Sequence, residues 1–186
     1  MKQESNDIHR QLVEACKAGN RKAFNDLYDS YARAMYNLCY RMMNNAEDAQ
    51  DMLQEAFVDA FRRLESFRFE STFGAWLKKI VINKCINALE KQKILWVDED
   101  IPDSLCTTPD TYSPDEDELQ LSIERVKKAM NRLPEGARVI FSLYLIEGYD
   151  HSEISEILHI SESTSKTQFM RARRMVKEIL LAMPEL

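Results

Sequence analysis

Apolar residues recur every three or four positions along most of this chain, which is the spacing of one face of an α-helix. The clearest example is the segment 46–67, AEDAQDMLQEAFVDAFRRLESF. Its apolar stripe consists of Ala49, Met52, Leu53, Ala56, Phe57, Ala60, Phe61 and Leu64. No run alternates between apolar and polar residues with the period of two that a half-buried strand requires. The pattern therefore predicts an all-α fold.

The same spacing predicts helices on both sides of this segment. Upstream, two helices are separated by a Gly-Asn break, and downstream a helix from 74 to 91 follows Ser71 or Thr72, either of which can cap its N-terminus. Near the C-terminus, Pro134 can open a helix that Gly148 can end. Apart from 46–67 and 74–91, the predicted helices cover residues 12–19, 24–43, 123–133, 135–148, 151–160 and 163–180.

Charge divides the chain into three parts. The 186 residues carry a formal net charge of −6, to which residues 1–93 contribute +2, residues 94–120 contribute −9 and residues 121–186 contribute +1. The middle part contains no Lys or Arg, three of the five prolines and no helical apolar period, which argues against a packed core. We therefore expect two small helical domains, 1–93 and 121–186, joined by an acidic extended linker, 94–120. An ordinary acidic loop is the alternative.

Composition argues against several classes of protein. The four cysteines include no CxxC spacing, and the three histidines do not complete a zinc pattern with them. The longest dense apolar run, residues 139–146, is far below the roughly 20 residues of a membrane span, and the N-terminus has no signal-peptide stretch. No Ser/His/Asp, paired-carboxylate or phosphate-loop constellation is present. We therefore expect a cytoplasmic protein with reduced thiols, no metal or other cofactor, no membrane insertion and no enzymatic activity.

The segment 151–180 has the pattern of a helix-turn-helix. On a helical wheel, one narrow edge of its second helix collects Ser165, Phe169, Ala172 and Val176 and is predicted to be buried, while the opposite edge is polar and basic. Such a helix enters the DNA major groove, where Arg can pair with guanine and Gln with adenine. A surface helix with incidental arginines is the alternative. The candidate DNA contacts are Ser163, Thr164, Lys166, Thr167, Gln168, Arg171 and Arg174.

Two more rows of polar residues follow helical spacing. In the segment 46–67, Asp48, Asp51, Glu55 and Asp59 form an acidic row with Gln54 beside it; such a row is either a partner surface or simply a solvated helix face. In the segment 74–91, the row consists of Trp76, Lys79, Asn83, Asn87 and Glu90, and the preceding loop contains Phe67, Arg68, Phe69 and Phe73. Aromatic faces beside basic groups suit single-stranded nucleic acid, although aromatic residues on a helix are also common in protein cores.

These motifs together resemble the extracytoplasmic-function (ECF, group 4) sigma factors. The resemblance rests on AEDAQDMLQEAF, FRFESTFGAWLKKIVINK, the acidic stretch and RLPEGARVIFSLYLIEGYDHSEISEILHISESTSKTQFMRARR, in one colinear order from about residue 12 to 181. It implies a transcription initiation subunit of bacterial RNA polymerase with two helical modules, sigma domains 2 and 4. The implied partners are core polymerase (the β′ clamp coiled coil and the β flap), promoter DNA and an anti-sigma factor, and the free protein is expected to be a monomer.

The resemblance also implies roles for particular residues. The helix 46–67 would dock on the β′ clamp coiled coil through Asp48, Asp51, Gln54 and Glu55. The C-terminal helix-turn-helix would read the −35 element. A loop at 67–72 and the helix after it would capture a flipped base of the −10 element and promote melting, with Arg68, Ser71, Thr72, Trp76, Lys79, Asn83, Lys84 and Asn87 as contacts.

The chain departs from the family pattern at the helix-turn-helix. His159 stands where the family usually has Gly, and Ser163 and Ser165 stand where Gly and Val are common. Gln168 and Met170 replace residues that are often basic, which puts the −35 preference in doubt. Two other functions stay open at this point: a dimeric helix-turn-helix regulator that never joins polymerase, and a helical adaptor or anti-sigma-like protein that does not bind DNA.

Overall fold

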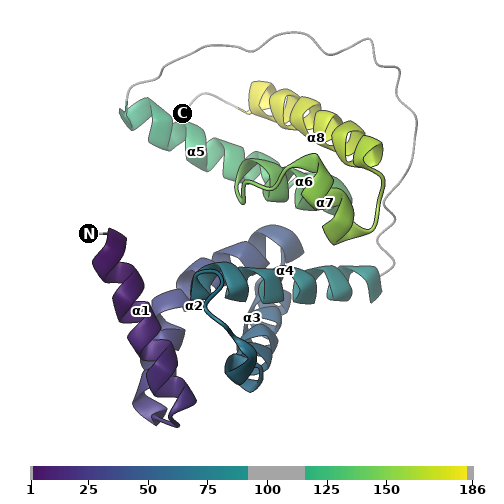
Figure 1. The fold of residues 1–186 in the computed structure, drawn as a ribbon. Coiled ribbons are helices and arrows are strands. Elements are labelled where there is room, and N and C mark those ends of the chain that lie inside the picture. Colours follow the sequence, from purple (N-terminus) through teal and green to yellow (C-terminus); the bar gives the residue numbers. More distant parts are fainter. Residues whose placement is uncertain (1, 92–115, 184–186) are drawn as a thin grey trace. The chain divides into compact units, whose positions relative to one another are not determined.

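The computed structural model describes residues 2–91 and 116–183, with side chains over 9–91 and 123–183 (Figure 1). It divides into two compact units, Met1–Lys93 and Ile94–Leu186. Every regular element in the described residues is helical, so the all-α prediction is confirmed. Most of the predicted linker, residues 94–115, lies outside the described part of the chain.

The first unit contains α1 (Lys2–Lys17), α2 (Arg21–Met43), α3 (Ala46–Arg62), the 3₁₀ turn η1 (Leu64–Ser66) and α4 (Phe73–Lys91). The long helix α2 contacts α1, α3 and α4, so the core of the unit surrounds it. Its centre consists of fully buried large side chains from these helices, among them Leu27, Leu38, Met42, Leu77 and Ile82.

Short polar residues begin the helices of this unit. The Asn45 side chain accepts hydrogen bonds from the backbone N–H groups of Glu47 (2.8 Å) and Asp48 (3.3 Å) at the start of α3. Thr72 Oγ1 accepts one from Ala75 N at 3.2 Å, so of the two predicted caps for α4 it is Thr72 that bonds the first turn. The helix α3 ends at Arg62, earlier than predicted, and the chain turns through η1 toward the loop 67–72.

The second unit contains α5 (Glu116–Met130), α6 (Glu135–Leu145), α7 (His151–Leu158) and α8 (Glu162–Ala182). The helix α8 contacts the other three, around a core that includes Ile140, Leu143, Ile154 and Leu158. Arg125 on α5 donates from Nη2 to the carbonyl oxygen of Leu180 at 3.0 Å, which ties α5 to the last turn of α8.

Two predicted boundaries in this unit are wrong. The linker was expected to continue to residue 120, but α5 begins at Glu116. Acidic residues are favoured at helix N-termini, so an acidic run can start a helix as well as extend a linker. The helix α6 was expected to end at Gly148 but ends at Leu145; Gly148, with φ of +79°, belongs to the turn that follows.

Candidate functional site

The helix-turn-helix consists of α7, a tight turn and α8. A capping box opens α7: Asp150 Oδ1 accepts from Glu153 N at 2.8 Å, and Glu153 Oε2 accepts from Asp150 N at 2.9 Å. The turn is made at His159, whose φ of +54° lies in the left-handed region that favours glycine. His159, which stands where the family usually has Gly, is therefore the residue of this turn with a strained backbone.

The second helix of this motif has the predicted N-cap and buried edge. Ser161 Oγ accepts a hydrogen bond from Thr164 N at 3.0 Å. The four residues of the predicted edge are all buried: Ser165, Phe169, Ala172 and Val176. On the outer side, Ser163, Lys166 and Arg174 are exposed, while Thr167 and Arg171 are half-buried. The structure therefore presents these five residues on the outside of α8.

Two of the candidate DNA contacts were placed on the wrong side of α8. Thr164 is only 6% exposed and Gln168 only 9% exposed, so both belong to the packed side. The Thr164 hydroxyl is taken up by the cap, 2.7 Å from Ser161 Oγ. The buried side of α8 is wider than the stripe on the helical wheel because α5, α6 and α7 all pack against it.

A histidine that sequence reasoning did not single out joins the two helices. His151 Nδ1 lies 2.9 Å from the hydroxyl of Ser165, and its ring stacks on Tyr144 with 4.4 Å between centroids. Burial lowers the pKa of His151 below its usual value, with a smaller contribution from the nearby Lys166 charge. The neutral imidazole is therefore the form that fits between α7 and α8.

The acidic row of α3 is accessible. Asp51, Gln54 and Glu55 are exposed and Asp48 is half-buried. Val58 lies one turn further along the same face and is 46% exposed, which is unusual for a large apolar residue in this unit. The row thus ends in an apolar side chain that the charge pattern alone did not reveal.

Lys84 on α4 bridges to this row. Its Nζ lies 2.8 Å from Asp59 Oδ2 and 3.3 Å from Glu55 Oε2. The hydrogen bond from Lys84 lowers the pKa of Asp59, and the hydrogen bond to Asp59 raises the pKa of Lys84. Sequence reasoning assigned Lys84 to −10 DNA and Glu55 to polymerase; the structure brings these two side chains together.

The polar row of α4 divides into exposed and packed members. Lys79, Asn83 and Asn87 are exposed, whereas Trp76 is half-buried with its ring centroid 5.1 Å from that of Phe67. Phe67 is buried in the core of the unit, as is Phe73. The alternative of core aromatics therefore holds for the two phenylalanines, and Trp76 keeps part of its ring accessible.

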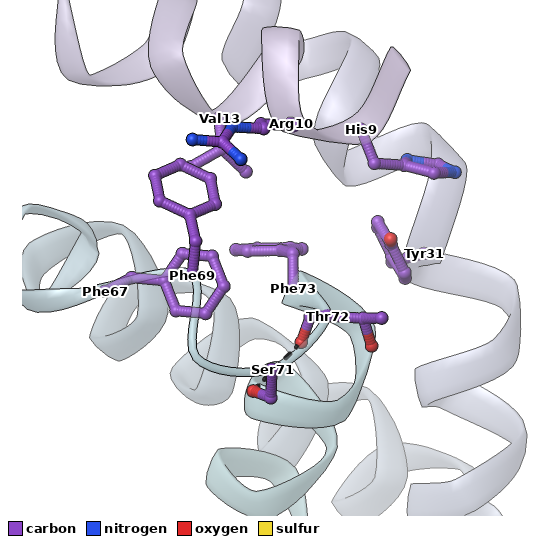
Figure 2. A pocket seen from close by; sticks show the side chains of 9 residues that line it. All are labelled: His9, Arg10, Val13, Tyr31, Phe67, Phe69, Ser71, Thr72 and Phe73. Atoms are coloured by element: carbon purple, nitrogen blue, oxygen red, sulfur yellow. Dashed lines mark hydrogen bonds between the residues drawn. The ribbon is translucent and has the colours of Figure 1, made fainter. Parts of the chain in front are cut away.

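The loop 67–72 borders a small cavity beside α1. Arg68, Ser71 and Thr72 are exposed, and Phe69 adopts a φ of +59°, an uncommon conformation for a bulky residue. Figure 2 shows the loop side chains facing those of α1 and Tyr31 across this space. The cavity has a volume of about 110 Å³. Its lining consists of His9, Arg10, Val13, Tyr31, Phe67, Phe69, Ser71, Thr72 and Phe73.

Two cations of α1 hold this loop. Lys17 Nζ donates to the carbonyl oxygen of Phe67 at 2.7 Å, and it lies 5.1 Å from the centroid of the Phe69 ring. The Arg10 guanidinium carbon lies 4.9 Å from the same centroid, within the range of a cation–π contact. Sequence reasoning missed both residues because α1 precedes the loop by about fifty positions, and no local pattern links them.

Comparison with known proteins agrees with this geometry. Residues 27–94 match sigma-70 region 2 and residues 123–176 match sigma-70 region 4. The chain is 30% identical over 179 residues to the ECF RNA polymerase sigma factor SigW of Bacillus subtilis, which covers 92% of this chain and 96% of that protein. It is 32% identical over 174 residues to the ECF RNA polymerase sigma-E factor of Haemophilus influenzae, with 89% and 92% covered. The chain belongs to the ECF RNA polymerase sigma factors.

Two solved structures share the fold of this sigma factor. One is CnrH in complex with the cytosolic domain of CnrY, with a TM-score of 0.55, 23% identity, and 95% of this chain and 99% of that chain covered. The other is the sigma factor RpoE from Bartonella quintana in complex with the anti-sigma factor NepR, with a TM-score of 0.55, 22% identity, and 88% and 99% covered. The sequence-based predictions of family and fold class are confirmed, and as an ECF sigma factor the protein is a transcription initiation factor that acts with RNA polymerase.

The matched regions contain most of the candidate sites. Region 2 includes α3, the loop 67–72 and α4, and region 4 includes the helix-turn-helix, whereas α1 precedes the residues matched to region 2. Over 2–91 and 116–183, none of the helices combines the length and apolar character of a bilayer span. No cluster of metal-ligating side chains occurs in the same described ranges.

Proposed function

We propose that this sigma factor docks on core RNA polymerase through α3, opens the −10 element with the loop 67–72 and α4, and reads the −35 element with α8. The observation that carries the proposal is the outward polar side of α8 opposite a fully buried edge, in a chain whose other unit presents an acidic helix face. A dimeric regulator would need the first surface but has no use for the second.

The polymerase-binding surface consists of Asp51, Gln54 and Glu55, with Asp48 at its edge and Val58 as an added apolar contact. Exposed carboxylates attract a basic partner over a range of about a Debye length, which favours rapid encounter more than tight binding. Burial of Val58 would add affinity, because an apolar side chain released from water contributes whether or not salt is present. We propose a basic helical surface of core polymerase, such as the β′ clamp coiled coil, as the partner.

The −10 site consists of the exposed loop residues Arg68, Ser71 and Thr72 and the exposed row of α4, Lys79, Asn83 and Asn87. Trp76 offers a partly accessible ring for stacking, and the cavity beside the loop offers a place for one unstacked base. Capturing a base offsets the few kcal/mol that its unstacking and unpairing cost, so melting needs no nucleotide hydrolysis. Lys84 remains a candidate contact, although its pairing with Asp59 gives it a second role in joining α3 and α4.

The −35 site consists of Ser163, Lys166, Thr167, Arg171 and Arg174. Lys166 pairs with Glu162 at 2.7 Å and Arg174 with Glu178 at 3.8 Å, both within α8 and both exposed. Exposed pairs of this kind are worth about 0–1 kcal/mol, so DNA phosphates or bases can replace the carboxylates at little cost. Gln168 and Thr164 are buried on the opposite side of α8, where their packing fixes the orientation of the DNA-facing side.

The acidic segment between the units limits how the two sites act together. Two promoter elements about two duplex turns apart lie roughly 70 Å from each other. The roughly 24 residues between Lys91 and Glu116 span at most about 80–86 Å when extended. On this proposal the segment is drawn out when both elements are bound, and its carboxylates suit a polymerase channel built for nucleic acid.

A protein partner that blocks these surfaces is also part of the proposal. The two solved neighbours were captured with the cytosolic domain of CnrY and with the anti-sigma factor NepR. We therefore propose an anti-sigma factor for this protein, and a cytoplasmic site of action together with polymerase. An apolar contact on the polymerase face, such as Val58, is the kind of residue that such a competitor would cover.

Run-off transcription tests the proposal. Purified core polymerase and this protein are mixed with genomic DNA fragments, and discrete run-off products are expected only when both are present. Replacing Arg171 and Arg174 by Glu should abolish the products without reducing the binding of core polymerase. Replacing Asp51 by Lys should instead reduce the binding of core polymerase.

Matched substitutions control for charge. Lys128→Glu changes an exposed cation of α5, outside the helix-turn-helix. Asp29→Lys changes an exposed carboxylate on α2 instead of α3. Both control variants should behave as the wild type. A wild-type protein that neither binds core polymerase nor directs initiation on any fragment would refute the proposed function.

A further inference from the structure

We propose that α1 is a third wall of the −10 site and that Arg10 contacts the nucleotide captured there. The inference rests on the proposed function of the loop 67–72. It extends the site to a helix that lies outside the residues matched to sigma-70 region 2. The ligand is one unpaired nucleotide of single-stranded DNA.

The cavity is built from both sides. Figure 2 shows Ser71, Thr72 and Phe73 on the loop and the start of α4, with His9 and Arg10 facing them from α1 and Tyr31 from α2. Without α1 the space would be an open depression in the loop. Because side chains of α1 and of the loop line the same space, α1 helps to determine its width.

The volume suits a single planar heterocycle. At about 110 Å³ the cavity exceeds the roughly 10–15 Å³ that one water occupies, and it falls well short of the roughly 300–1,000 Å³ of a cofactor or drug-sized pocket. Among its aromatic lining residues, the half-buried Tyr31 and Phe69 can provide faces and edges for stacking, whereas Phe73 is buried in the core. The hydroxyl groups of Ser71 and Thr72 stand at the same cavity and can bond the polar edge of a base.

Arg10 is placed to hold the rest of the nucleotide. Its guanidinium carbon lies 4.9 Å from the Phe69 ring centroid, and the side chain forms an exposed ion pair with Glu14, at 3.2 Å between Nε and Oε1. An exposed pair one helical turn apart contributes only a few tenths of a kcal/mol, so a phosphate can replace it. Arginine presents a planar fork of donors that suits phosphate oxygens, and the same plane stacks on rings.

His9 and Lys17 complete the α1 contribution. His9 lines the cavity, and its ring centroid lies 5.1 Å from that of Tyr31, so it supports the Tyr31 side of the space. Lys17 acts as a positioning residue. Its hydrogen bond to the Phe67 carbonyl oxygen fixes the part of the loop that precedes Phe69, whose backbone is in the left-handed region. Arg10 and Lys17 thus both contact the Phe69 ring.

The test uses the complex of full-length protein with core polymerase and a single-stranded oligonucleotide carrying the −10 region of a promoter found by run-off transcription. Its affinity is measured by fluorescence anisotropy over a range of salt concentrations. Arg10→Ala should weaken binding about tenfold, the scale of one lost contact to a captured base. It should also reduce the slope of log affinity against log salt by about 0.7, the value for one phosphate contact on a single strand.

Three further variants distinguish a direct contact with the nucleotide from an indirect effect on the loop. Arg10→Lys keeps the charge and should restore the salt slope while recovering only part of the affinity. Arg21→Ala removes another exposed arginine of the first unit, away from the cavity, and should match the wild type. Lys17→Met should weaken binding with the salt slope unchanged, because Lys17 acts on the loop and not on the phosphate.

The results separate a failure of the Arg10 contact from a failure of the proposed function. If Arg10→Ala binds with wild-type affinity and wild-type salt slope, α1 does not contact the nucleotide and the inference is overturned, while the proposed function stands. If the wild-type complex uses no promoter at all, the proposed function fails and the inference fails with it.

Discussion

Replacing Phe169 by alanine should disable the second unit while leaving the first intact. Phe169 lies on the buried edge of α8, and its ring centroid is 4.4 Å from that of Tyr144 and 5.6 Å from that of His151. It also faces Phe141 at 5.9 Å. One side chain therefore joins α8 to α6 and to the start of α7, which is the packing that sets the angle of the helix-turn-helix.

The cost of this substitution is large relative to the stability of the unit. Truncating a buried phenylalanine to alanine costs about 3–5 kcal/mol through lost burial and the cavity left behind. A unit of about 70 residues has a total stability on the order of 3–10 kcal/mol. The variant should therefore populate the unfolded form of the second unit substantially, because the loss is comparable with everything that holds this unit together.

Hydrogen exchange measured by mass spectrometry resolves the effect by segment, which a single melting curve of a two-unit protein does not. Peptides from α6, α7 and α8 should lose protection in Phe169→Ala, whereas peptides from α2, α3 and α4 should exchange as in the wild type. Binding of a −35 duplex should be lost in parallel. Leu181→Ala is the matched control on the same helix: Leu181 is 78% exposed, so its truncation should change protection by less than about 0.5 kcal/mol.

The reasoning would be refuted by either of two results. Wild-type protection of α6 to α8 in the Phe169→Ala protein would show that this ring does not hold the helices together. Equal loss of protection in α2 to α4 would show that the two units are not independently packed.

Three other predictions concern single interactions. Lys84→Met should lower the unfolding midpoint of the first unit by removing the tie to Asp59, and a double-mutant cycle with Asp59→Asn should show coupling between the two sites; additive effects would contradict the pair. Acidification should destabilise the second unit, because folding lowers the pKa of His151. The contribution of His151 to the stability of this unit is fully present above the unfolded pKa of about 6.5, and it is lost as the pH falls through the folded pKa. His151→Gln should flatten this dependence in thermal melts between pH 5 and 8, and an unchanged profile would exclude His151 as its source. Ser161→Ala should cost about 1 kcal/mol by removing the N-cap of α8, measured as exchange of the first-turn amides, whereas Ser161→Asp should be tolerated; equal protection in all three proteins would argue against the cap.

The periodicity of apolar and polar residues was sufficient to predict the features that depend only on residues close together in the sequence. The helix class, the buried edge of α8 and the acidic row of α3 follow from which side chains share a face every 3.6 residues. The caps at Thr72 and Ser161 follow from side chains that accept a hydrogen bond from the amide three positions ahead. Such interactions are local, so they can be predicted before the fold is known.

Contacts between distant segments were decided by tertiary packing alone. The loop 67–72 is held by Lys17, fifty residues earlier, and Lys84 pairs with Glu55, twenty-nine residues away. Gln168 sits on a helix whose buried side is wider than its apolar stripe, since the width of that side depends on how many helices pack there. A linear sequence shows which residues point the same way from one helix. Which of those faces is covered, and by what, is determined only when the helices come together.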